Sequence, residues 1–335
     1  MLYKILKQTL IGLALLVGLF ILLMLTPRIW SALHPGKPPV GYFFLPPTYL
    51  AVYTGIESQA DKPLTIPAHI ETTRDVEYKQ IHGKSLRMDF YHAKGSPQNL
   101  PLLVFIHGGA WSHGDRSEYL GYALHFANLG YATVTLTYRF VKDAPYPACV
   151  EDVTDAVQFL FEHGEQYRYD PDKIVLIGGS AGAHLAMLAA YGWKSSAAIP
   201  GTTDTLDHLL ARHKIKALVE LYGPVDFTTE YARNQSMVTR LMAHSYMETP
   251  QLYAEASPLF WVSKEAPPTL ILHGTSDNLV PIGQAEQLKH KLDSLGVPNV
   301  YLPLPGWPHT TDLVKRVSDY FKMAMGDFLD KYVSN

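Results

Sequence analysis

The sequence predicts an α/β fold with a mostly parallel central sheet and helices on both faces. From about residue 72 onward, short apolar runs of strand length alternate with amphipathic segments of helix length, and this alternation is typical of parallel sheets joined by helical crossovers. Runs such as Pro101–Ile106 are apolar at every position, as expected of strands buried on both faces. We therefore expect ligand chemistry at the carboxyl ends of the strands.

The individual elements follow from apolar periodicity and from the turn residues between them. The first two strands form a predicted hairpin around Gly83. Strands are expected at 75–82, 84–92, 101–106, 132–138, 173–177, 217–221, 269–272 and 299–302, and helices at 118–129, 147–163, 181–191, 284–295 and 311–332. A chain of about 260 residues in this pattern can form one domain with a substantial core.

Residues 1–34 are predicted to form a membrane anchor. No charged residue occurs in the 20 residues of Gln8–Pro27, and a helix of that length spans roughly 30 Å, the thickness of the hydrocarbon of a bilayer. A cleaved signal peptide is the alternative, but its apolar region usually has about 7–15 residues and ends at a small-residue cleavage site.

Charges on either side of this span predict its orientation. Lys4, Lys7 and the terminal amine precede it, whereas Arg28 and Lys37 follow it. The positive-inside tendency favours a cytoplasmic N-terminus by this narrow excess. We expect a single-pass membrane protein whose main domain lies outside the cytoplasm, or a secreted protein if the segment is cleaved.

Residues 35–71 are rich in proline and aromatic residues and are predicted to form a connector. Pro35–Pro39 and the pair Pro46 and Pro47 should prevent a continuous helix. The aromatic residues of Tyr42–Tyr53 predict a segment that packs on the main domain. The alternative is an interfacial segment that holds the domain against lipid, because aromatic side chains favour that boundary.

Composition excludes several classes of function. The chain has 28 Lys+Arg and 31 Asp+Glu, so it lacks the basic surplus of a nucleic-acid-binding protein. Its single cysteine, Cys149, cannot form an intramolecular disulfide or a thiolate zinc site. No phosphate-binding, dinucleotide-binding or zinc-protease motif occurs, and the histidines do not cluster at ligand spacing. We expect no metal and no cofactor.

A nucleophilic serine is predicted at Ser180. Gly178–Gly182 matches Gly-x-Ser-x-Gly and lies between a predicted strand and a predicted helix. This context is typical of the nucleophile elbow, a tight turn that raises the serine hydroxyl above the sheet and requires small neighbouring residues.

The base and the acid are predicted from chain order, because they follow the serine as Asp/Glu and then His in this architecture. His309 lies beyond the last strand on a Pro-rich turn and is the expected base. Asp277 lies beyond the strand 269–272 and can orient the imidazole. Asp226 is the rival acid, but it follows the preceding strand.

The motif His107-Gly-Gly-Ala-Trp111 directly follows the strand 101–106. Its glycines allow backbone N–H groups to face a developing oxyanion, together with the N–H of Ala181. The bulk of Trp111 should cap one side of the acyl pocket.

These motifs together resemble the α/β-hydrolase superfamily over about residues 72–333. The resemblance is closest to its carboxylesterases, hormone-sensitive-lipase-like esterases and kynurenine-formamidase-like enzymes. It implies that the oxyanion donors are Gly109, Ala110 and Ala181. The lipase-like group usually has glycine in place of Ala110 and aspartate in place of Gly179, so the sequence is more similar to the His-Gly-Gly-x-Trp esterases and formamidases.

The predicted protein is therefore an anchored serine hydrolase with an α/β-hydrolase domain at 72–335. It should cleave small carboxylic esters through an acyl-enzyme. An amidase or formamidase with the same residues is the alternative enzyme, and a catalytically silent anchored binding protein is the alternative of another class. Two insertions, at about 192–214 and 227–265, are expected to form a small cap over the pocket.

Overall fold

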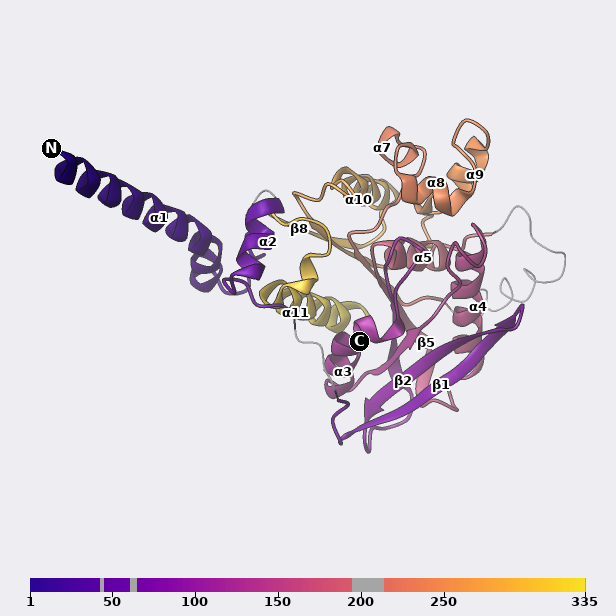
Figure 1. The fold of residues 1–335 in the computed structure, drawn as a ribbon. Coiled ribbons are helices and arrows are strands. Elements are labelled where there is room, and N and C mark those ends of the chain that lie inside the picture. Colours follow the sequence, from indigo (N-terminus) through magenta and orange to yellow (C-terminus); the bar gives the residue numbers. More distant parts are fainter. Residues whose placement is uncertain (43–44, 61–64, 195–213, 335) are drawn as a thin grey trace.

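A mixed sheet of eight strands organises the described part of this computed structural model, which covers residues 1–42, 45–60, 65–194 and 214–334 (Figure 1). In sheet order the strands are β1 (Ile70–Ile81), β2 (Lys84–Ala93), β4 (Ala132–Leu136), β3 (Leu100–Ile106), β5 (Tyr169–Gly179), β6 (Ala217–Leu221), β7 (Thr269–Gly274) and β8 (Asn299–Leu304). The pairs β1–β2 and β2–β4 are antiparallel, and every later pair is parallel. The carboxyl ends of β3 and β5 to β8 therefore meet at one edge of the sheet.

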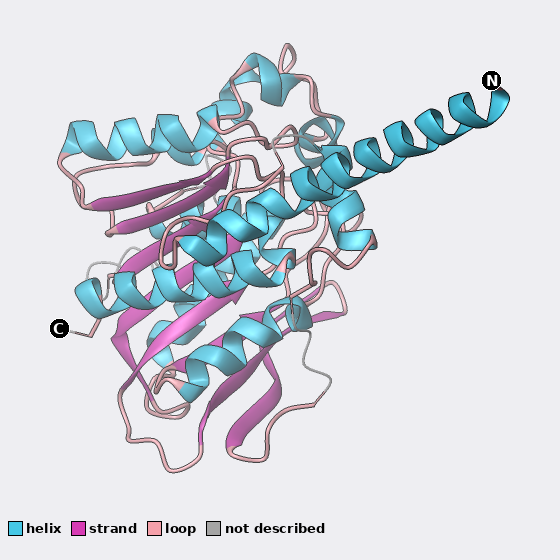
Figure 2. Cartoon of the chain, turned by 90° about the vertical axis from the view of Figure 1, so that its left-hand side faces the viewer, coloured by secondary structure: helices cyan, strands magenta, loops and turns pink. Residues whose placement is uncertain are grey.

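Helices cover both faces of the sheet, as predicted (Figure 2). Side chains of α4 (Ala148–Glu162), α5 (Ala181–Ala190) and α10 (Gly283–Leu295) share one apolar core with the sheet, and those of α3 (Leu120–Asn128) and α11 (Lys315–Tyr332) share a second. Successive side chains of a strand point to opposite faces. In β3, accordingly, Leu102 and Val104 belong to the first core, whereas Leu103 and Phe105 belong to the second.

The predicted elements are all present, with differences at their ends. The predicted helix 118–129 is divided into a 3₁₀ turn, η1 (Arg116–Tyr119), and α3, and the predicted helix 311–332 into η3 (Thr311–Leu313) and α11. β5 begins at Tyr169, four residues before its predicted start at Lys173. Strand β1 begins at Ile70, so the sheet includes the end of the predicted connector.

The N-terminal helix α1 (Leu2–Leu33) projects from the body (Figure 1). Among the described residues it is the one helix long and apolar enough to cross a membrane. The predicted span ends at Pro27, whereas α1 continues through this proline. A proline removes one backbone hydrogen bond from a helix. In α1 the helix continues on both sides of Pro27 despite this loss.

The connector also contains one short helix that was not predicted, although the prolines were expected to exclude only a continuous helix. This helix, α2 (Leu45–Tyr53), begins immediately before Pro46 and Pro47. The first N–H groups of a helix have no intrahelical acceptor, so two prolines in the first turn cost α2 no hydrogen bond.

Contacts attach the connector to the loop that follows β8. The backbone N–H groups of Gly41 and Tyr42 donate to the carbonyls of Pro305 (2.7 Å) and Gly306 (3.0 Å). The indole Nε1 of Trp307 donates to the Pro39 carbonyl at 2.8 Å. The part of the connector before α2 thus packs on the main domain, whereas Tyr49 and Tyr53 of α2 are exposed.

Candidate active site

Ser180 lies at the turn between β5 and α5. Its φ of 54° and ψ of −121° are strained for a residue with a side chain. Its backbone N–H donates to Leu221 of the neighbouring strand at 2.8 Å, which fixes the turn against the sheet. This geometry is that of a nucleophile elbow.

The structure brings the three predicted catalytic side chains together. His309 Nε2 lies 2.9 Å from Ser180 Oγ, and His309 Nδ1 lies 2.6 Å from Asp277 Oδ2. Each residue follows the carboxyl end of a different strand, β5, β7 or β8. A proton can therefore pass from the serine hydroxyl to an imidazole whose other nitrogen donates to a carboxylate.

Hydrogen bonds hold the buried Asp277 in its ionised form. Its Oδ1 accepts the backbone N–H groups of Leu279 (2.9 Å) and Val280 (2.8 Å), and His273 Nε2 lies 3.3 Å from its Oδ2. Burial opposes ionisation, but the hydrogen bonds from His273 and His309 outweigh it and lower the pKa of Asp277 to about 2. The carboxylate therefore remains charged at neutral pH and stabilises an imidazolium at His309.

Asp226, the rival acid, lies apart from this arrangement. Its carboxylate accepts the N–H (2.8 Å) and the hydroxyl (2.7 Å) of Thr228 within its own loop after β6. Its backbone N–H donates to the side chain of Gln284 on α10. These bonds give Asp226 a role in shaping that loop.

A second pair of buried titratable groups, Glu220 and His273, lies behind Asp277. Glu220 on β6 is fully buried and accepts the backbone N–H of Gly223. Its other oxygen and His273 Nδ1 have no hydrogen-bond partner in the described part of the chain. Burial raises the pKa of Glu220 to about 7, although the charge of His273 opposes this. Motif spacing does not reveal this pair, because Glu220 lies inside an apolar strand and His273 ends one.

The raised pKa of Glu220 predicts a pH-dependent loss of stability. Above its ordinary pKa the unfolded chain releases this proton, whereas the folded chain retains it up to about pH 7, so the folded state is stabilised at low pH and loses that advantage as the pH rises. Wild type should lose about 2–3 kcal/mol of unfolding free energy from pH 5 to pH 8 through this group, at 1.36 kcal/mol per pKa unit. Glu220→Gln should not show this loss, so its stability relative to wild type should rise by the same amount over this range. Urea unfolding at both pH values measures this. The exposed carboxylate of Glu71 offers a control, Glu71→Gln, and equal pH dependence in wild type and Glu220→Gln would contradict the prediction.

The predicted oxyanion loop lies against the elbow. A Cβ added to Gly108 would lie 2.9 Å from the Gly179 carbonyl and 3.4 Å from Ser180 Cβ, so only glycine permits this approach. Gly109 and Ala110 follow with φ of 104° and 49°. Ala181 begins α5, where a helix N–H has no intrahelical acceptor. The loop after β3 and the start of α5 thus lie at the same edge of the sheet, and the roles of Gly109, Ala110 and Ala181 as oxyanion donors stay a prediction.

Trp111, the predicted wall of the acyl pocket, is held by contacts in the core. It is 2% exposed, packs edge-to-face on Phe227, and donates from Nε1 to His184 Nδ1 at 3.3 Å. His184 in turn lies 2.7 Å from the Ala256 carbonyl, and burial lowers its pKa to about 4, so it is neutral at pH 7. Trp111, itself at φ 55°, therefore anchors the strained loop to the core. Its predicted role as one wall of the acyl pocket stays a prediction.

Two tyrosines explain why glycine occupies position 179. A Cβ at Gly179 would lie 2.2 Å from the Tyr119 hydroxyl and 3.0 Å from the Tyr222 hydroxyl. Tyr222 donates to the buried Asp312 at 2.5 Å, and its ring packs edge-to-face on His309 at 5.0 Å between centroids. These hydroxyls fill the space that the aspartate of the lipase-like pattern would need.

The predicted insertion 227–265 forms a helical cap. It contains α7 (Glu230–Arg233), α8 (Ser236–Met242), α9 (Pro250–Glu255) and the turn η2 (Pro258–Phe260), and η2 contacts α5 and α10 (Figure 1). Burial and the nearby Asp277 charge raise the pKa of Tyr231. Phe227, the first residue of the insertion, packs edge-to-face on Trp111 of the predicted oxyanion loop. The insertion therefore contacts the candidate site. Most of the other predicted insertion, 195–213, lies outside the described residues.

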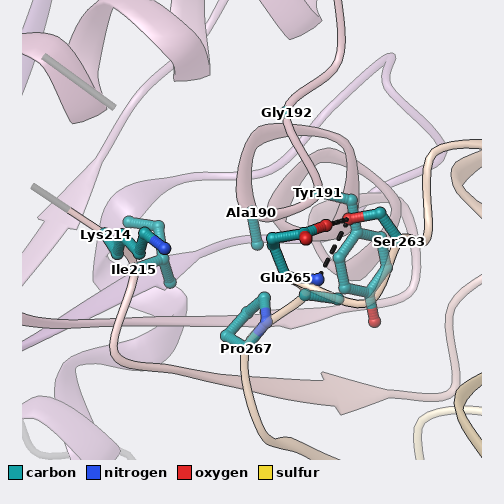
Figure 3. A pocket seen from close by; sticks show the side chains of 9 residues that line it. Ala190, Tyr191, Gly192, Lys214, Ile215, Ser263, Glu265 and Pro267 are labelled. Atoms are coloured by element: carbon teal, nitrogen blue, oxygen red, sulfur yellow. Dashed lines mark hydrogen bonds between the residues drawn. The ribbon is translucent and has the colours of Figure 1, made fainter. Parts of the chain in front are cut away.

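A cavity of about 160 Å³ lies elsewhere (Figure 3). Its lining includes Ile215 and Pro267, which directly precede β6 and β7, and Ser263, whose hydroxyl donates to Glu265 at 3.0 Å. The cavity thus lies at the amino ends of the strands, at the opposite edge from Ser180, and is not part of the candidate site. Within the described ranges, no group of three His, Cys, Asp or Glu side chains is arranged to hold a metal ion.

Comparisons with known proteins show the family of this chain. A family model described as BD-FAE matches residues 88–292. Esterase LipQ of Mycobacterium tuberculosis is 34% identical over 238 residues, which cover 68% of this chain and 55% of LipQ. The probable carboxylic ester hydrolase LipM of the same organism is 34% identical over 221 residues, which cover 64% of this chain and 50% of LipM. The chain thus spans about half the length of these curated relatives.

Solved structures show the same fold. A truncated carbohydrate esterase from gut microbiota superimposes with a TM-score of 0.65 at 22% identity and covers 79% of this chain and 97% of that one. A propionate-bound esterase of Thermogutta terrifontis gives 0.65 at 20% identity and covers 79% and 94%. The predicted α/β-hydrolase fold is therefore confirmed.

Proposed function

The chain belongs to the BD-FAE family, and from this membership we propose that it is a serine carboxylesterase. The observation that carries the proposal is the pair of hydrogen bonds that His309 shares with Ser180 and Asp277. The esterase names of the relatives LipQ and LipM support the same activity. The substrate is a small carboxylic ester, and the reaction needs no cofactor.

The proposed reaction uses the groups in the order that their positions suggest. Ser180 Oγ attacks the ester carbonyl while His309 Nε2 takes its proton, and Asp277 stabilises the imidazolium. The N–H groups of Gly109, Ala110 and Ala181 bind the oxyanion. His309 then protonates the departing alcohol, and a water molecule activated by the same imidazole releases the acid from the acyl-enzyme.

Two other functions are alternatives to the carboxylesterase, and experiment can distinguish them. An amidase or formamidase would use the same three residues, so the two activities differ in the substrates that the cap admits. A silent binding protein would retain the fold without the chemistry. The strained backbone at Ser180 argues against this second alternative, because strain of this kind is costly and persists where it serves function.

The domain arrangement and the location are part of the proposal. Residues 1–34 form the anchor, 35–71 the connector and 72–335 the catalytic domain. The long apolar helix α1 supports a single span with the catalytic domain outside the cytoplasm, and the same helix would serve as a signal sequence if it were cleaved.

A membrane-impermeant fluorophosphonate probe tests activity and location together. Such a probe phosphonylates an activated serine, so intact cells that express the full chain should show a labelled band of full length that is absent in Ser180→Ala. Labelling only after lysis would reverse the proposed orientation, and no labelling in either sample would support the silent binding protein. Hydrolysis of matched acetyl-ester and N-formyl substrates by the purified protein separates esterase from formamidase.

A further inference from the structure

The short connector helix α2 packs on the anchor helix α1 at a point inside the uncharged run of α1. A small buried cluster contains Met24 of α1, Ala51 of α2, and Tyr42, which precedes α2. Met24 is 4% exposed and Ala51 is fully buried. The Tyr42 hydroxyl donates to the Met24 carbonyl at 3.2 Å. Met24 lies inside the uncharged run Gln8–Pro27. The structure thus holds α2 at the level of the last turn of the proposed span.

The opposite face of α2 is apolar and exposed. Tyr49, Leu50 and Tyr53 are 68%, 38% and 91% exposed, whereas Thr48 and Ala51 are buried. Residues four apart share one face of a helix, so Tyr49 and Tyr53 lie side by side. The segment Leu45–Tyr53 contains no charged residue. Exposure of an apolar face to water is unfavourable, and its transfer from water into lipid is favourable.

Residues near the end of α1 indicate where the membrane surface lies. Arg28 is exposed one turn after Met24 and donates to the Ile56 carbonyl just beyond α2. Trp30 stacks on His34 at 4.5 Å between ring centroids. Tryptophan and tyrosine favour the headgroup region, and a cation favours the same level. If α1 spans the bilayer, α2 therefore lies at its surface.

Arg316 of α11 holds the connector on the main domain. Its guanidinium donates to both carboxylate oxygens of the buried Glu57, to Ser31 Oγ at 2.9 Å and to the Val40 carbonyl at 2.9 Å. It also stacks over Trp307 at 4.6 Å. Trp307 precedes His309 by two residues. A network of one cation and several fixed acceptors thus joins the anchor, the connector and the loop that carries the base.

We infer that α2 is an interfacial helix whose Tyr49, Leu50 and Tyr53 lie in the headgroup and upper acyl region of a bilayer. The connector then holds the catalytic domain at a fixed height and orientation on the membrane. The inference rests on the proposed insertion of α1 and adds a second lipid contact to it.

Spin-label accessibility tests this contact. Full-length Tyr53→Cys, labelled with a nitroxide, is reconstituted into vesicles of phosphatidylcholine and phosphatidylglycerol. Collisions with oxygen, which is enriched in lipid, are compared with collisions with a water-soluble nickel chelate. Leu16→Cys, at an exposed position of α1, gives the lipid reference, and Met247→Cys, at an exposed position of the cap, gives the water reference. The native Cys149 is buried, and labelled wild type gives its background.

The oxygen-to-nickel ratio of the Tyr53→Cys label should exceed that of the Met247→Cys label several-fold, and Tyr49→Cys should give the same result. A water-like ratio at both positions, with Leu16→Cys in lipid, would overturn the inference and leave the anchor intact. A water-like ratio at Leu16→Cys would instead contradict the proposed insertion, on which the inference depends. Spin–spin broadening at Tyr53→Cys that disappears on dilution with unlabelled protein would assign this face to a second copy of the chain and overturn the lipid contact.

Discussion

Replacing Ser180 with alanine should lower kcat for ester hydrolysis by at least ~10⁴-fold while the protein remains folded, because the three residues act as a unit. Without Ser180 Oγ, the imidazole 2.9 Å away has no nucleophile to activate. Initial rates on p-nitrophenyl acetate measure the loss, and thermal unfolding shows whether the fold is retained. His309→Ala should give a loss of similar size, and the double variant should lose little more than either single one.

The matched control is Ser263→Ala. This serine lines the cavity of Figure 3. The cavity lies at the amino ends of β6 and β7, whereas Ser180 follows the carboxyl end of β5. The activity of this variant should stay close to that of wild type. A purified Ser180→Ala protein with a wild-type rate would refute the proposed mechanism, and loss of activity in Ser263→Ala would move the site to the other edge of the sheet.

The parts of the site that the sequence predicts are those defined by chain order. In a parallel sheet, residues that directly follow strands meet at one edge, so the position of Ser180 after one strand and of Asp277 and His309 after two others is enough to bring them together. The elbow is recognisable because its strained turn requires small residues at fixed spacing. The same reasoning places Asp226 one strand too early, and the structure shows that residue bonded within its own loop.

The residues that the sequence does not reveal are those whose role depends on a partner far along the chain. Glu220 looks like one position of an apolar strand until β6 pairs with β7, which carries His273 two residues beyond the partner of Glu220, Ile271. The bulk of Trp111 suggests a pocket wall, but the sequence does not show its hydrogen bond to His184, 73 residues away. Pro46 and Pro47 exclude a continuous helix but not a new helix with both prolines in its first turn, because the first turn needs no N–H donors.

Asp277→Asn should lower kcat by about 10⁴-fold, because the Asn amide N–H₂ would face His309 Nδ1 and force the ring proton onto Nε2. Nε2 is the nitrogen that must accept the Ser180 proton. The backbone N–H groups of Leu279 and Val280 can still donate to the Asn oxygen, which holds the side chain in this orientation. The variant should therefore fold and lose activity through the tautomer.

Asp226→Asn is the control for this prediction, since both aspartates are buried on loops that follow neighbouring strands. Its carboxylate accepts only from Thr228 among the hydrogen bonds of the described residues, and an Asn oxygen can accept the same bonds, so most of the activity should remain. Single-turnover rates of acylation by p-nitrophenyl acetate compare the two variants directly. If Asp226→Asn lost as much activity as Asp277→Asn, the orienting carboxylate could not be assigned to the loop after β7. If Asp277→Asn retained wild-type acylation, His309 would act without an orienting carboxylate, and the 2.6 Å contact between the two side chains would be structural alone.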